Sequence, residues 1–106
     1  MLYLAIVETF TPEGRKNLKK VWEWQKELDN WLIVHGAKFK LAKHFLPLIG
    51  EPLYETWLEY PNYAALDEDA EKAKEFAQDL KWQELMMQMN VYFERISSRI
   101  VKPVLM

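Results

Sequence analysis

Histidine side chains are the first place to look for acid–base chemistry, and this sequence contains two of them. His44 lies in a segment where apolar and polar residues alternate, as they do in a strand. A general acid or base needs a pKa near neutrality and a substrate within hydrogen-bond reach. His44 and Tyr54, from the next predicted strand, are therefore the candidate catalytic residues. The simpler alternative for His44 is a place at a subunit seam or in solvent, and His35 is positioned to cap a helix end.

Charged residues inside predicted strands are the second feature, because burying a charge without a partner costs free energy. They are Glu8, Glu55, Glu59 and Arg99. In the predicted strand order, the strand of Glu8 lies between the strand of Glu55 and Glu59 and the strand of Arg99. We expect Glu8, Glu59 and Arg99 to form a charge cluster inside a barrel. Such a cluster is either an ion-pair network that sets dimer register or part of a catalytic site.

A ligand pocket is the third feature that the residue types predict. Aromatic residues make up 14% of the chain, and alanines recur along one face of a helix around residues 66–80. Small residues leave volume beside a sheet, and aromatic rings and methionines line apolar cavities. The alternative is that the same bulky side chains fill the core. The predicted lining is Tyr3, Glu55, Trp57, Trp82 and Met86.

Several kinds of chemistry are disfavoured. The chain has no cysteine, which excludes disulfides and thiol nucleophiles. The histidines lack metal-ligand spacing, the glycines are isolated, and no serine stands in a nucleophile elbow. The formal net charge is −2 and no basic stripe occurs, so nucleic acid is not an expected partner. We expect no metal and no cofactor.

The elements that must position these residues follow from periodicity. Both alternating sets of residues 2–10 are apolar, which predicts a strand covered on both faces. Thr11 and Pro12 then start a long helix that ends at Val34 or His35, before Gly36 in the left-handed C′ position. In this helix Trp22 belongs to the main apolar stripe and Trp24 does not. The remaining prediction is strands at 37–46, 53–60 and 96–104, a connection at 47–52, and two helices that follow Asn62 and bend near 78–80.

This order, β-α-β-β-α(α)-β, predicts one α+β domain over residues 1–106 with a ferredoxin-like, four-stranded antiparallel sheet. Lysines at 38, 40 and 43 suggest that the strand at 37–46 is a sheet edge. Helices cover one face of the sheet, and apolar residues on the other face also need cover. A second copy of the chain is the simplest source, which predicts a homodimeric α+β barrel. The apolar N-terminus is too short and too soon charged for a signal peptide or membrane span, so we expect a cytoplasmic protein without membrane association.

The chain also resembles NIPSNAP-like members of the dimeric α+β barrel superfamily. The resemblance is carried by HGAKF at 35–39, the Gly50 connection, ETWLEYPNYAAL at 55–66, the segment around Trp82, and SSRIVKPV at 97–104. It implies a homodimer with a pocket in each subunit and does not imply a particular reaction. Haem is not expected, since no histidine falls on the second helical region where one could ligate iron.

Three hypotheses for function remain open. The leading one is a homodimer that binds a small apolar or aromatic molecule between sheet and helices. The second is an enzyme, namely a cofactor-free monooxygenase, cyclase or isomerase with a histidine or tyrosine as acid/base group. The third is a structural or regulatory dimer without a ligand. In the first two, the predicted location of the site is a strand face shared by His44, Glu55, Trp57 and Glu59.

Overall fold

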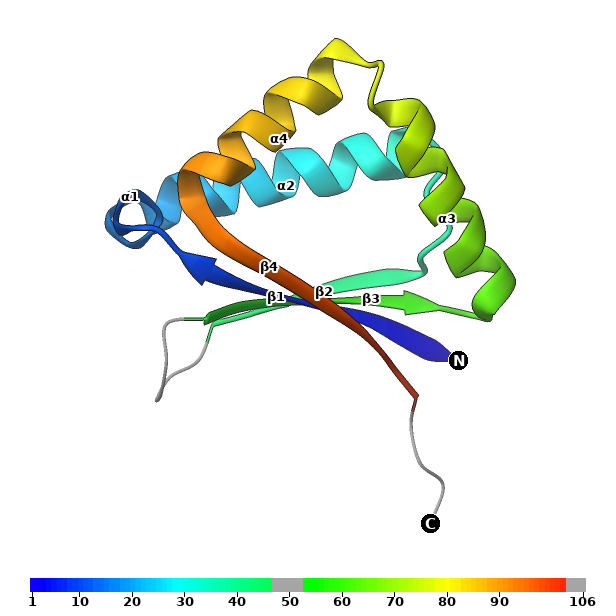
Figure 1. Ribbon diagram of the computed structural model, residues 1–106. Coiled ribbons are helices and arrows are strands. Elements are labelled where there is room, and N and C mark those ends of the chain that lie inside the picture. Colours follow the sequence, from blue (N-terminus) through cyan, green and yellow to red (C-terminus); the bar gives the residue numbers. More distant parts are fainter. Residues whose placement is uncertain (47–52, 103–106) are drawn as a thin grey trace.

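The computed structural model describes residues 1–46 and 53–102. A four-stranded antiparallel sheet in the order β2-β3-β1-β4 forms one layer, and the helices form a second layer on one side of it (Figure 1). The elements are β1 (Leu2–Phe10), α1 (Pro12–Lys16), α2 (Leu18–Val34), β2 (Leu41–Phe45), β3 (Leu53–Tyr60), α3 (Tyr63–Phe76), α4 (Leu80–Tyr92) and β4 (Phe93–Val101). The predicted ferredoxin-like α+β fold is confirmed, with β2 at a sheet edge as its lysines suggested.

Local capping chemistry decides where the helices begin and end. The Thr11 hydroxyl accepts from the Gly14 backbone N–H, the Asn62 side chain caps α3, and Asp79 accepts from the N–H groups of Lys81 and Trp82 at the start of α4. Gly36 follows α2 with φ 85°, as predicted for a left-handed residue after a helix. The two helices after Asn62 are thus confirmed.

The single long helix predicted after Thr11 is wrong in one respect. It is divided at Asn17, whose φ of −123° and ψ of 46° interrupt the helix between α1 and α2. The Asn17 side chain donates to the carbonyl of Glu13, so this residue ends α1 in the way that polar side chains compete with helical backbone bonds. Because of this break, the short α1 turns away from α2 and lies beside the start of β4 (Figure 1).

Strand boundaries also differ from the periodicity. β2 begins at Leu41 rather than at residue 37, and β4 begins at Phe93, directly after α4, rather than at residue 96. The predicted connection at 47–52 lies outside the described residues. A register shift between Thr9 and Phe10 accommodates Phe93, which packs into the core at the start of β4.

The core forms between the helix layer and the sheet at the end where α1, α4 and β4 meet. Its buried cluster is Phe10, Val21, Trp24, Tyr54, Leu85 and Phe93. Trp24 is only 4% exposed, and its indole N–H donates to the Leu85 carbonyl over 2.9 Å, whereas Trp22 is 46% exposed. The assignment of Trp22 to the main stripe was therefore wrong, because the buried face of α2 is centred on Val21, Trp24 and Gln25, and Trp22 lies outside it. Among the described residues, no helix is long and apolar enough to cross a bilayer.

Candidate functional site

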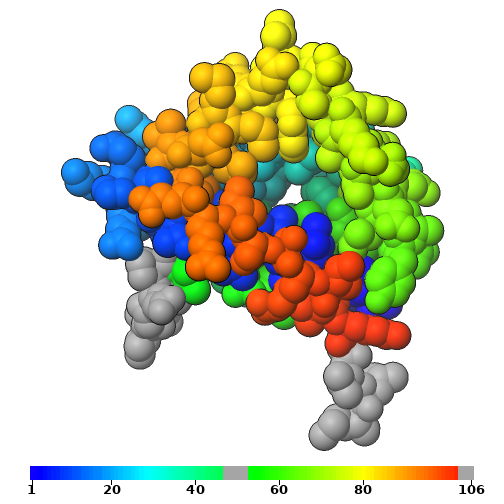
Figure 2. Space-filling model, viewed as in Figure 1, coloured from blue at the N-terminus to red at the C-terminus, as the bar shows by residue number. Residues whose placement is uncertain are grey.

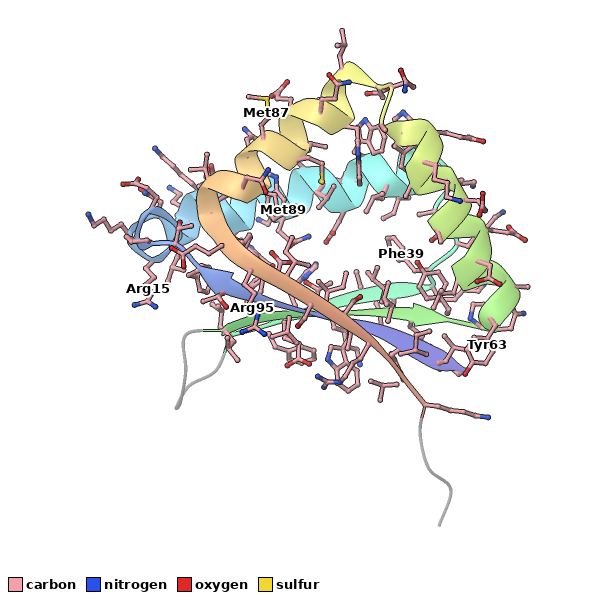
Figure 3. All side chains as sticks on the ribbon, viewed as in Figure 1. Arg15, Phe39, Tyr63, Met87, Met89 and Arg95 are labelled. Carbon is pink, nitrogen blue, oxygen red and sulfur yellow. The ribbon has the colours of Figure 1, made fainter. Side chains whose placement is uncertain are left out.

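A pocket of about 330 Å³ lies beyond this core, between the sheet, α2, α3 and α4. The space-filling view shows the hollow opening between α3, α4 and β4, with β1 behind it (Figure 2). Met89 points from α4 toward the sheet, and Phe39 lies between the sheet and α3 (Figure 3). Most of the pocket wall is apolar, and the apolar residues include Leu4, Ile6, Leu28, Leu58, Leu66, Trp82, Met86 and Met89. Ala70 and Ala73 on α3 also line it, so the alanine stripe does face open volume.

Glu8 brings a carboxyl group into this apolar wall. The residue is 6% exposed, and its Oε2 atom has no hydrogen-bond partner among the described residues. Burial raises the Glu8 pKa from an ordinary value of 4.5 to about 7. A buried acceptor that the protein leaves unsatisfied is rare, because it costs free energy unless water or a ligand supplies a donor.

A chain of hydrogen-bonded side chains lies next to Glu8 and runs from β3 to α2, then to β2, and returns to β3. The Tyr54 hydroxyl donates to Gln25 Oε1 over 2.9 Å, and Gln25 Nε2 donates to Asp29 Oδ1 over 2.9 Å. His44 Nε2 lies 2.7 Å from Asp29 Oδ2, and His44 Nδ1 lies 2.8 Å from Thr56 Oγ1. Because a carboxylate only accepts, Nε2 of His44 donates to Asp29, while Nδ1 of the same ring shares a hydrogen bond with the Thr56 hydroxyl. Both Asp29 oxygens are thus held by protein donors.

The far side of the pocket has a second satisfied carboxylate. Asp69 on α3 accepts from the Lys38 backbone N–H over 2.8 Å and from the Tyr60 hydroxyl over 2.8 Å. Burial raises the pKa of Tyr60, and its bond to Asp69 adds to the shift. Burial also raises the pKa of Tyr54, with Asp29 and Glu8 contributing. Both phenols therefore stay protonated and act as donors.

The residues predicted to line one pocket are divided between the two faces of the sheet. Trp82 and Met86 line the pocket, but Tyr3, Glu55 and Trp57 do not. Tyr3 and Trp57 pack against each other at 5.4 Å between ring centroids, and the Trp57 indole donates to Glu55. Their positions alternate with pocket-lining Leu4, Thr56 and Leu58, which places them on the face away from the helices.

The predicted charge cluster of Glu8, Glu59 and Arg99 is not assembled. Glu8 faces the helices, whereas Arg99 and Glu59 lie on the opposite face with Tyr3 and Ala5, their paired positions on β1. Arg99 instead pairs with Glu55 over 3.4 Å. Adjacent strands in the sheet were predicted correctly, but the register sends these side chains to different sides.

The shared strand face predicted for His44, Glu55, Trp57 and Glu59 is also wrong. His44 pairs with Thr56, so it lies on the helix face, one position out of step with the other three residues. His44 and Tyr54 are close, with stacked rings 5.9 Å apart, but neither lines the pocket. Their hydrogen bonds connect them to Asp29, Thr56 and Gln25, which do line it. His35 lies at the end of α2, where its Nδ1 is 2.8 Å from the Trp31 carbonyl and its ring stacks on Trp31.

Sequence reasoning missed Asp29, Thr56 and Gln25 as residues of a site, and it assigned Glu8 to the wrong cluster. One signal was available, because Gln25 occupies a position in the apolar stripe of α2 and Asp29 follows four residues later on the same face. A polar pair on the buried face of a helix needs polar partners from the sheet. Within residues 1–46 and 53–102, no group of His, Cys, Asp and Glu side chains is arranged to hold a metal ion.

Comparison with known proteins supports the fold directly. No family model and no curated protein sequence matches the chain. Among solved structures, an uncharacterized NIPSNAP domain protein from Burkholderia xenovorans aligns with a TM-score of 0.70 and 17% identity, over 98% of this chain and 95% of that one. A NIPSNAP family protein from Agrobacterium tumefaciens aligns with a TM-score of 0.69 and 21% identity, over 97% and 92%. This chain has the NIPSNAP domain fold.

The fold is shared more widely than that one group. An antibiotic biosynthesis monooxygenase aligns with a TM-score of 0.63 and 15% identity, over 98% of this chain and 99% of that one. At these identities the likeness concerns the backbone arrangement, which hosts different activities in different proteins. The chemistry must therefore be argued from the pocket itself.

Proposed function

We propose that this protein binds a small, largely apolar molecule in the pocket between the sheet and helices α2, α3 and α4. The observation that carries the proposal is a buried Glu8 carboxyl in the wall of an apolar cavity of about 330 Å³, with an Oε2 atom that no described residue hydrogen-bonds. Ligand cavities begin at about 300 Å³ and combine apolar walls with a few polar groups. A purely structural domain would be more stable with this space filled and this carboxyl bonded, since cavities and unsatisfied polar groups both lower the free energy of unfolding.

The proposal includes a homodimer that pairs the sheet faces opposite the helices. That face carries part-exposed Tyr3, Leu41, Phe45 and Trp57 beside the Arg99–Glu55 ion pair. Aromatic residues and arginine are enriched where proteins associate. Packing two such faces together would bury apolar area that a single chain leaves in water.

One observation favours a second candidate, an enzyme that uses acid–base chemistry without a cofactor. Glu8, with its pKa of about 7 and an Oε2 atom that no described residue hydrogen-bonds, has the properties of a general base at neutral pH. This would give the acid/base role of a cofactor-free monooxygenase, cyclase or isomerase to Glu8 instead of His44 or Tyr54. The binding proposal does not depend on this step.

Binding can be tested with 1-naphthylmethanol, a neutral aromatic probe, followed by calorimetry and by the fluorescence of the wall residues Trp24 and Trp82. We expect saturable binding with one site per chain. Ala70→Phe, which fills the pocket, should abolish it, whereas Ala64→Phe on the exposed surface of the same helix should not. Absence of binding at millimolar probe, or equal binding by Ala70→Phe, would contradict the proposal.

A further inference from the structure

The pocket wall has charges of a single sign. Its ionisable carboxyl groups are Glu8, Asp29 and Asp69, and no Lys, Arg or His is found among the described residues that line it. Two of the three are already satisfied, Asp29 by Gln25 and His44, and Asp69 by Lys38 and Tyr60. Glu8 differs from these two, because its Oε2 atom has no partner in the described part of the chain. The pocket therefore offers a ligand acceptors and negative charge, within otherwise apolar walls.

We propose that the ligand of this pocket is an amphipathic primary amine, with its ammonium group on Glu8 and its hydrocarbon or aromatic part along Trp82, Met86 and Met89. This inference rests on the proposed ligand-binding function and specifies the chemical class of the ligand. An ammonium group has three hydrogen-bond donors and no acceptor, and the polar groups that the pocket wall offers to a ligand are acceptors. Thr56 Oγ1 and the Asp29 carboxylate lie on the same wall as Glu8 and can share in holding it.

Other ligand classes fit less well. A carboxylate or phosphate ligand would bring a further negative charge to a site without a cation, and a buried charge without a counter-ion is strongly disfavoured. A neutral alcohol could donate to Glu8, but it would leave the buried negative charge of the ionised carboxylate without a counter-ion, which an ammonium group supplies. Selectivity should thus follow the order amine, alcohol, carboxylate.

The surroundings of Glu8 also specify how binding should depend on pH. On the side of α2 the facing group is Asp29, which is bonded to His44 of β2. From β3 comes Tyr54, which is paired with Glu8 in the sheet. The residues of α4 and β4 that line this wall, Met86, Met89 and Ile96, are apolar, and Asp69 lies on α3. Because burial raises the Glu8 pKa to about 7, an ammonium ligand should bind more tightly as pH rises through neutrality.

The experiment uses three probes with one naphthalene body: 1-naphthylmethylamine, 1-naphthylmethanol and 1-naphthoate. At pH 8, calorimetry on the full chain should give an amine affinity about tenfold or more above that of the alcohol, with the carboxylate weakest. Glu8→Gln should lower amine affinity to near that of the alcohol while changing alcohol affinity by less than about threefold. Glu23→Gln, on the exposed surface of α2, should leave all three affinities unchanged. Equal binding of amine and alcohol, or tightest binding of the carboxylate, would overturn the inference and leave the pocket proposal intact, whereas failure of all three probes would overturn both.

A second measurement needs no variant. Amine affinity of the unmodified protein should rise about tenfold from pH 6 to pH 8, following ionisation of a group with a pKa near 7, while alcohol affinity should not rise. A flat pH profile for the amine over that range would also overturn the assignment of its ammonium group to Glu8.

Discussion

Glu8 shows how one residue can take its properties from the fold rather than from its neighbours in sequence. It lies in a β-strand between Val7 and Thr9, yet its side chain enters an apolar wall built by residues of distant segments. Removal from water disfavours the charged form and raises the pKa to about 7. The same desolvation makes an ionised Glu8 unfavourable for folding, and it is the reason for placing the ammonium group of the proposed ligand there.

Glu8 therefore predicts a specific dependence of stability on pH. The pKa of this acid is higher in the folded protein, about 7, than the 4.5 of the unfolded chain, so the folded state binds the extra proton between these values. The Glu8 contribution to the free energy of unfolding should be most favourable below pH 4.5 and should fall by up to about 3 kcal/mol as pH rises through 7. Denaturant unfolding of wild type and Glu8→Gln at pH 5 and pH 8 measures this, with the variant gaining stability over wild type only at pH 8. An equal difference at both pH values would contradict the assignment.

The chain of bonds from Tyr54 to Thr56 makes a second prediction at this scale. Tyr54→Phe removes the donor to Gln25 Oε1, which is buried, and leaves that oxygen unsatisfied. We expect a loss of about 1–3 kcal/mol in the free energy of unfolding. The matched control is Tyr63→Phe, whose side chain is exposed and which should change stability by less than about 0.5 kcal/mol. Equal effects of the two variants in denaturant titrations would show that the Tyr54 bond carries no stability.

Helices α1 and α4 meet where their backbones approach closely, and Gly14 makes that approach possible. A Cβ atom at Gly14 would collide with the carbonyl of Tyr92, at the end of α4. The same junction is held by two bonds from Thr11, whose N–H donates to the Tyr92 carbonyl and whose hydroxyl donates to the Val91 carbonyl. The junction ties the first helix to the last and holds the end of α4 over the start of β4.

Gly14→Ala should therefore destabilise the protein by about 1–3 kcal/mol, because backbone atoms on both sides must move apart. Thermal unfolding measures the loss. Asn90→Ala, at an exposed position of α4, is the control and should have little effect. If Gly14→Ala melted at the wild-type temperature, the close approach of α1 and α4 would be ruled out as a determinant of stability.

The whole molecule is a sheet with helices on one side, and we propose a different role for each face of the sheet. The pocket belongs to the helix face, and the proposed dimer contact belongs to the other (Figure 1). Adjacent residues of β1 and β3 thus lie on different faces, as with Thr56 on the pocket wall and Trp57 on the far side. A substitution can accordingly test one function and leave the other in place.

Trp57→Glu should weaken the proposed dimer, since a charge would replace an aromatic ring on the sheet face that the dimer would bury. Sedimentation at micromolar concentration should show a shift toward monomer, with the dissociation constant raised at least about 30-fold, as for an interface hot spot. Met87→Glu, on the outer surface of the helix layer with Met87 71% exposed, should leave assembly unchanged. A wild-type protein that is already monomeric under these conditions would contradict the dimer.

Much of this architecture is local in origin, and for that reason the sequence by itself determines it. The helix starts at Thr11, Asn62 and Asp79 and the left-handed Gly36 depend on hydrogen bonds and dihedral angles within a few residues. The order of strands and helices, and with it the ferredoxin-like sheet, follows from such signals together with hydrophobic periodicity.

Only the tertiary structure decided which side chains share a face and which meet. His44 was placed with Trp57 and Glu8 with Arg99, although a shift of one residue in register sends a side chain to the opposite side of a sheet. Trp24 is buried and Trp22 is exposed, because the face of α2 that packs against the core is centred on Trp24 and its neighbours Val21 and Gln25. Register and rotation depend on contacts between segments far apart in the chain. The site formed by Glu8, Asp29 and Thr56 therefore exists only once the sheet and α2 have packed together.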